Sequence, residues 1–214
     1  MQITTKSASM TKVQWLALLS FSGILLYIII DLILFFLRPD LPVFTHAESD
    51  YGNGSWSWLM DGNFLLRCAL SLAALLAFWS ALPRTLLSRI GLVLFGVWAI
   101  GSGILAFFPD DYEGTPPTVH GAIHLLVAAI AFLCCLLATL LLTILLARRW
   151  RGRPVVIGLI LSWILAAAGQ FLLVRHGFAP GSLDGLYERI FLGFELLWIA
   201  LVMAQLAWGK QQAG

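Results

Sequence analysis

The sequence predicts an all-α membrane protein: a polytopic helix bundle with six transmembrane helices and with its N- and C-termini in the cytoplasm. Of its 214 residues, 60% are hydrophobic and 11% are charged, whereas a soluble domain averages about 25% charged residues because its surface faces water. The apolar residues form six long segments, and most of the basic residues gather on one side of them. We therefore expect one transmembrane domain over residues 1–214, with the lipid bilayer as its partner and no nucleic-acid ligand.

Each apolar segment approaches the length of about 20 residues that a helix needs to cross the hydrocarbon core. The first segment is longer than the apolar part of a signal peptide and has no clean cleavage site after it, so we expect an uncleaved span. Pro83 separates the second segment from the third, Pro109 ends the third, and Pro154 lies where a helix start tolerates proline. The longest connection, about 38–62, is rich in Gly, Ser and Asp and is expected to be solvated. The predicted spans are approximately residues 13–37, 64–82, 86–108, 119–147, 154–174 and 186–208.

The basic residues give the predicted orientation of the six spans. Nine of the 13 Lys and Arg residues fall on one side of the spans, and cytoplasmic loops carry the excess of these residues. We therefore assign this side, which includes both termini, to the cytoplasm. The nine residues are Lys6, Lys12, Arg84, Arg89, Arg148, Arg149, Arg151, Arg153 and Lys210.

Ionisable residues within or beside the outer halves of the spans form the candidate functional set. An ionisable group in a span costs about 2.5–3.5 kcal/mol on insertion scales, so it usually faces the protein interior and finds a partner there. We expect an interior polar network that either joins the helices through ion pairs or lines an outward-facing pocket, and no catalytic residue can be assigned. The candidate residues are Asp31, Arg67, Asp110, Asp111, His120, His124, Glu188, Arg189 and Glu195.

His120 and His124 are four residues apart and therefore share one face of a helix. Two imidazoles at this spacing suit a divalent metal such as zinc, and Asp110 and Asp111 precede them in the same loop. Two interfacial histidines that bond to neighbours or water are the commoner case, so no cofactor is firmly implied. All four histidines map to the outer side, which leaves no second depth for a transmembrane haem relay.

One local motif supports a family resemblance. The sequence Phe-Pro-Asp at residues 108–110, Thr118, His-Gly-Ala-Ile-His at residues 120–124, and the Glu188–Arg189 pair resemble the family catalogued as domain of unknown function 998. These are small, mostly bacterial, six-helix membrane proteins, so the resemblance implies a multi-pass protein of the bacterial inner membrane with a polar patch around the third outer loop. It implies no activity, and a fold alone would not supply one.

Two classes of function fit these features. The first is a non-enzymatic binding or accessory subunit, which takes a lipid ligand or packs against a larger membrane complex. The second is a membrane-embedded hydrolase in which a metal-activated water attacks a lipid or another amphiphile near the outer interface, with a carboxylate as general base. A small transporter is a third possibility, but we find no paired interruptions of the spans of the kind that mark many transporter sites.

Reporter fusions test the predicted topology. A fusion at Thr45 is expected outside the cytoplasm and a fusion at Gly214 inside it, because the basic residues define the cytoplasmic side. Paired alkaline phosphatase and fluorescent protein fusions measure this directly. Two fusions on the same side of the membrane would contradict the six-span topology.

Overall fold

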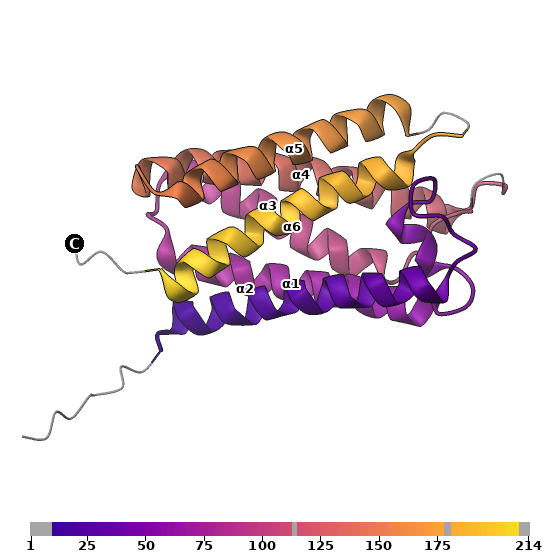
Figure 1. Ribbon diagram of the computed structural model, residues 1–214, viewed down its shortest axis with the longest axis horizontal. Coiled ribbons are helices and arrows are strands. Elements are labelled where there is room, and N and C mark those ends of the chain that lie inside the picture. Colours follow the sequence, from indigo (N-terminus) through magenta and orange to yellow (C-terminus); the bar gives the residue numbers. More distant parts are fainter. Residues whose placement is uncertain (1–9, 113–114, 178–180, 210–214) are drawn as a thin grey trace, which may run out of the picture.

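The computed structural model describes residues 10–112, 115–177 and 181–209, so Lys6 and Lys210 of the topology argument lie outside the described residues. Over that part of the chain it is all-helical and contains six helices that are each long and apolar enough to cross a membrane (Figure 1). This confirms the predicted fold class, and it indicates a bilayer environment. The helices are α1 (Lys12–Leu37), α2 (Ser57–Ala81), α3 (Leu86–Leu105), α4 (Val119–Arg149), α5 (Pro154–His176) and α6 (Asp184–Trp208), with a short 3-10 helix, η1 (Glu48–Gly52), between α1 and α2.

Local capping chemistry explains most of the helix starts. The side-chain oxygens of Thr11, Thr85 and Thr118 each accept a backbone N–H at the start of α1, α3 and α4, which satisfies donors that a helix leaves unpaired. Pro154 occupies the first turn of α5. Helix α2 begins at Ser57, seven residues before the predicted second span, which lies almost entirely within it. The polar residues of its first two turns lie at the end of the bundle, where the hydropathy pattern does not register a helix.

The helices run back and forth along one bundle axis (Figure 1). Both described chain ends lie at one end of the bundle, which we call the terminal end. The α1–α2, α3–α4 and α5–α6 connections lie at the opposite end, which we call the loop end. Helix α6 packs against α1 and α5, and α3 packs against α2 and α4.

Aromatic side chains fill the centre of the bundle. Trp98 and Trp198 are both fully buried, so their indole N–H groups need acceptors. Trp98 Nε1 donates to Ser71 Oγ at 3.1 Å, and Trp198 Nε1 donates to Thr143 Oγ1 at 2.8 Å. These two bonds tie α3 to α2 and α6 to α4 without leaving an unsatisfied polar group in the core.

The α1–α2 connection does not behave as the solvated loop that its composition predicts. All five residues of η1 are buried, because the connection turns inward and lies over the loop end of the bundle (Figure 1). We refer to residues 43–52 as the inserted segment. Arg38 precedes the inserted segment and joins the two ends of the connection. Its guanidinium donates to the Asp40 carboxylate, and its Nη1 donates to the carbonyl oxygen of Asn53 at 2.6 Å.

Close packing of α5 on α6 depends on Gly169. A Cβ atom at this position would lie 2.7 Å from the backbone nitrogen of Phe191 and 3.0 Å from the carbonyl oxygen of Tyr187. Both are backbone atoms of α6, which cannot rotate away. We expect Gly169→Ala to destabilise the protein by about 1–3 kcal/mol, the usual cost of overpacking, when thermal unfolding is followed in detergent micelles.

Gly193→Ala is the matched control, because a Cβ atom at this helical glycine has nothing within 4 Å. Alanine stabilises a helix relative to glycine by about 0.5–1 kcal/mol, so this variant should be neutral or slightly more stable. Equal stability of the two variants would show that the α5–α6 contact is not the tight one described.

Candidate functional site

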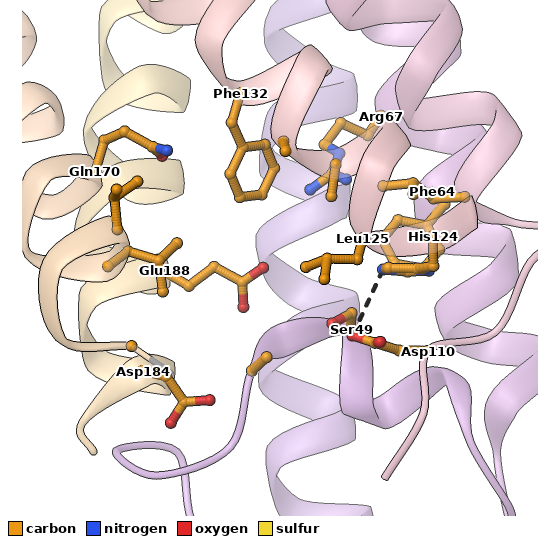
Figure 2. A pocket seen from close by; sticks show the side chains of 17 residues that line it. Ser49, Phe64, Arg67, Asp110, His124, Leu125, Phe132, Gln170, Asp184 and Glu188 are labelled. Carbon is orange, nitrogen blue, oxygen red and sulfur yellow. Dashed lines mark hydrogen bonds and ion pairs between the residues drawn. The ribbon is translucent and has the colours of Figure 1, made fainter. Parts of the chain in front are cut away.

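A cavity of about 320 Å³ lies at the loop end between α2, α4, α5, α6 and the inserted segment (Figure 2). Its polar lining includes four of the candidate residues, Arg67, Asp110, His124 and Glu188. Its apolar lining includes Leu125 on α4 and Val174 on α5, which are 50% and 65% exposed. Both residues belong to helices that are long and apolar enough to cross a membrane.

Arg67 lies on the α2 side of the cavity and is almost fully buried, with 1% of its surface exposed. Its Nη1 donates to the hydroxyl of Tyr27 at 3.1 Å, and its Nε donates to Ser102 Oγ at 3.2 Å. The guanidinium also lies 4.9 Å from the centre of the Trp98 ring and 5.1 Å from that of Phe64. A buried cation is stabilised by such ring faces, so Arg67 is fixed in position without a carboxylate in contact.

Tyr27 and Glu48 connect Arg67 to Glu188. The Tyr27 hydroxyl donates to the Glu48 carboxylate, and the backbone N–H of Glu48 donates to Glu188 Oε2 at 2.5 Å. The chain of bonds therefore runs from α2 through α1 and η1 to α6. Four distant parts of the sequence meet in it, and all four side chains are buried.

Arg189 lies behind the cavity and binds the inserted segment. Its Nη1 donates to the carbonyl oxygens of Val43 at 2.8 Å, His46 at 2.7 Å and Gly185 at 3.2 Å. Asp31 is close enough to interact electrostatically with Arg189, but it forms no salt bridge with it among the described residues. Arg189 therefore acts mainly on backbone carbonyl groups rather than as the predicted ion-pair partner.

His124 lies at the wall formed by the α3–α4 connection. Its Nδ1 donates to the carbonyl oxygen of Phe108 at 2.6 Å, and since a carbonyl can only accept, Nδ1 carries the proton. Its Nε2 lies 3.8 Å from Asp110 Oδ2, and the same carboxylate oxygen accepts a hydrogen bond from Ser49 Oγ at 2.9 Å. Asp110 thus joins the α3–α4 connection to the inserted segment.

Asp111 has a structural role at the start of α4. It accepts hydrogen bonds from the backbone N–H of Thr118 at 2.8 Å and from its hydroxyl at 2.7 Å, and these bonds lower the pKa of Asp111. A Cβ atom at Gly121 would collide with this carboxylate. His120 is exposed and packs against the Phe108 ring at 5.7 Å, so neither Asp111 nor His120 lines the cavity.

Glu195 is separate from the cavity. It lies two turns along α6 from Glu188, is 1% exposed, and accepts a hydrogen bond from Thr139 Oγ1 at 3.2 Å. Its second carboxylate oxygen has no hydrogen-bond partner. The structure therefore divides the predicted polar network into a cavity group, a group behind the cavity at Arg189, and this deeper carboxyl.

The described residues include no group of three or more His, Cys, Asp or Glu side chains placed to hold a metal ion. A catalytic zinc site commonly uses three protein ligands and a water. One nitrogen of His124 is already bonded to a carbonyl, and His120 faces away from the cavity lining. Metal binding by His120 and His124 therefore stays a prediction. The described part of the chain offers no third ligand beside them.

Three polar cavity residues are absent from the sequence-based candidate set: Ser49, Gln170 and Asp184. Tyr27 and Glu48, which connect Arg67 to Glu188, were absent as well. A single tyrosine in an apolar span and a glutamate in a loop carry no periodic signal. The one available signal was Gln170, an amide in an apolar helix, whose side-chain oxygen is buried without a partner.

The chain belongs to the family described as "Protein of unknown function (DUF998)", whose profile matches residues 21–205. This confirms the family resemblance that the residues around His124 and Glu188 indicated. No curated protein and no solved structure matches the chain. The family description gives no activity, so the function must be argued from the site itself.

Asp50, in the inserted segment, predicts a pH dependence of stability. Burial and the nearby charge of Asp110 raise the pKa of Asp50 to about 6 from its ordinary 3.8. The folded state thus binds this proton more tightly than the unfolded state. The contribution of protonated Asp50 to the stability of the folded state is full below pH 4 and is lost as the pH rises through 6. At pH 7 we expect Asp50→Asn to be more stable than the wild type, with a free energy of unfolding higher by at most about 3 kcal/mol and a higher unfolding temperature. At pH 4 the two proteins should differ little.

Asp40→Asn is the control of opposite sign. Hydrogen bonds from Arg38 lower the pKa of the Asp40 carboxyl, so this carboxylate stabilises the folded state above its ordinary pKa. The variant should therefore lose stability at pH 7 and match the wild type in acid. A stability curve for Asp50→Asn that runs parallel to the wild-type curve from pH 4 to 7 would refute the assignment.

Proposed function

We propose that this protein is a non-enzymatic binding protein of the cell membrane, and that its ligand is an amphiphile bound in the cavity. The headgroup contacts the polar lining near Glu188 and Asp110. The apolar tail leaves the cavity between α4 and α5. In the predicted topology the loop end faces away from the cytoplasm, so the headgroup binds in the outer leaflet.

One observation carries this proposal: the same cavity has a buried polar lining and an apolar lining that is exposed on helices long enough to cross a membrane. Arg67 and Glu188 are buried, while Leu125 and Val174 are exposed within membrane spans. The volume of about 320 Å³ lies at the lower end of the range for small-molecule sites, about 300–1,000 Å³. Such a volume holds a headgroup and the first part of a chain, so the rest of the chain must lie in the bilayer.

The contacts between α4 and α5 support a lateral opening. Trp163 Nε1 of α5 donates to the carbonyl oxygen of Leu136 of α4 at 3.0 Å, on the terminal-end side of the cavity. Toward the loop end, Leu173 and Val174 of α5 line the cavity opposite Leu125 and Ala129 of α4. The two helices are therefore joined in the middle of the membrane and separated by the cavity near the loop end.

A metal-dependent hydrolase, the alternative from the sequence, has no comparable support. The described residues provide no group of three candidate ligands, and the Asp111 carboxylate is engaged by Thr118. Binding of an amphiphile without a reaction requires only a polar lining for the headgroup and an apolar lining for the chain, and the cavity has both.

Filling the cavity tests the proposed function. Ala128 lines the cavity from α4, and Ala128→Phe places a ring in it. The probes are single-chain amphiphiles of equal length: dodecylamine, dodecanoic acid and dodecyl phosphate. We expect the wild type in a neutral detergent to retain at least one of them with one-to-one stoichiometry by native mass spectrometry. We expect Ala128→Phe to weaken that binding at least about tenfold, which corresponds to about 1.4 kcal/mol.

Ala168→Phe is the matched control, since Ala168 is an exposed alanine of α5 that does not line the cavity. It should bind the same amphiphile as well as the wild type. Equal binding by wild type and Ala128→Phe, or no saturable binding of any probe, would rule out the proposed function.

A further inference from the structure

The cavity has unsatisfied hydrogen-bond acceptors on its α5–α6 side. Glu188 is 8% exposed, and Figure 2 shows its side chain extending into the cavity. Its Oε2 accepts the backbone N–H of Glu48, but the described residues give Oε1 no donor. No arginine lies within salt-bridge distance of this carboxylate in the described part of the chain. Because Glu188 lines the cavity and this oxygen has no described donor, it identifies a place where a ligand could donate a hydrogen bond.

Gln170 adds a second acceptor on the same side. It lines the cavity from α5, and Figure 2 shows it on the same side as Glu188 and Asp184. Its side-chain oxygen is buried and has no hydrogen-bond partner. Asp184 also lines this side and contributes further negative charge.

Among the described residues that line the cavity, the one fixed positive charge is on the opposite side. Arg67 appears there in Figure 2 with Phe64, His124 and Asp110. Its guanidinium is bonded to Tyr27 and Ser102 and lies over aromatic rings, and it forms no salt bridge with Glu188 among the described residues. His124 donates its Nδ1–H to Phe108, and its Nε2 faces Asp110 Oδ2 at 3.8 Å. The cavity therefore has several acceptors and few free donors.

We infer that the cavity binds the protonated primary amine of an amphiphile, with the ammonium group donating to Glu188 Oε1 and to the side-chain oxygen of Gln170. This inference rests on the proposed function and specifies its ligand. An ammonium has three donors and one positive charge, which matches the two acceptor oxygens of Glu188 and Gln170 and a carboxyl group that no described cation contacts. A quaternary ammonium has no N–H and satisfies neither acceptor. Both a free alkylamine and the ethanolamine headgroup of a phospholipid carry the required group.

The depth of Glu188 agrees with a headgroup site. It lies in the second turn of α6, at the loop end, where the headgroup region of a bilayer would surround a bundle of this length. The apolar lining at Leu125, Leu173 and Val174 begins on the lipid side of the cavity. An amine bound at Glu188 thus leaves its hydrocarbon chain a path between α4 and α5.

The first experiment compares headgroups and removes one charge. Native mass spectrometry should show dodecylamine bound at least about tenfold more tightly than dodecanoic acid or dodecyl phosphate. Glu188→Gln should weaken dodecylamine binding by about tenfold or more, as expected for the loss of one charge-assisted hydrogen bond. Glu195→Gln is the matched control: Glu195 is a buried carboxyl of the same helix that does not line the cavity, and its substitution should leave binding within about twofold of wild type.

A second variant covers the case in which Glu188→Gln fails to fold. Gln170→Glu adds a carboxylate beside Glu188 at a position with nearly the same side-chain shape, and it should strengthen dodecylamine binding several-fold. Weaker binding by a folded Gln170→Glu protein would contradict the inference. So would tighter binding of the acid or the phosphate than of the amine.

A third measurement separates the two sources of the amine. The protein is purified from vesicles of phosphatidylethanolamine or of phosphatidylcholine, and the retained lipid is counted. Selective retention of phosphatidylethanolamine, reduced by Glu188→Gln, assigns the amine to the phospholipid. Displacement by dodecylamine without selective lipid retention assigns it to a single-chain amine. Binding that is blocked by Ala128→Phe but favours an anionic probe overturns the amine inference and leaves the proposed function standing, whereas binding unaffected by Ala128→Phe overturns both.

Discussion

The hydrogen bonds from Arg189 to the inserted segment are the interaction on which the loop end depends. Peptide groups at the end of a membrane bundle cannot be buried unless each polar atom finds a partner. Arg189 provides donors for the carbonyl oxygens of Val43 and His46, and Leu186 N donates to the carbonyl of Phe44. The close approach also requires Gly185, because a Cβ atom there would collide with the same carbonyl oxygens. A short stretch of irregular chain is thereby held against the start of α6.

Burial of that segment creates both the polar chain and one wall of the cavity. Glu48 reaches Tyr27 and Glu188 only because η1 lies inside the bundle end. Ser49, the next residue, contacts Asp110 and lines the cavity. Arg67 of α2 and Glu188 of α6 consequently line one cavity, and the inserted segment forms part of its wall.

The sequence predicted the helices better than it predicted the site. Six apolar segments and the prolines between them were sufficient for the fold, since hydropathy and backbone geometry act locally. The site depends on helix rotation and on the path of the inserted segment, neither of which is local. Hydropathy alone could not separate Glu195 from Glu188, although only Glu188 lines the cavity. The polar composition of the α1–α2 connection indicated solvation. The structure differs because a distant arginine, Arg189, satisfies carbonyl groups of this connection, and sequence patterns do not reveal such a contact.

The packing at the start of α4 has a consequence for sequence variation among relatives. Asp111 binds the backbone and hydroxyl of Thr118, Thr118 caps the helix at Gly121, and Gly121 leaves room for the Asp111 carboxylate. Each of the three residues makes a contact that depends on another of the three. Replacing one of them therefore removes the contact that the other two make with it. We expect these three residues, which form one capping unit, to vary together among relatives, and we expect the spacing between them to be constrained as well. The register of His124 against Phe108 follows from that unit, which makes a short capping motif the determinant of one cavity wall.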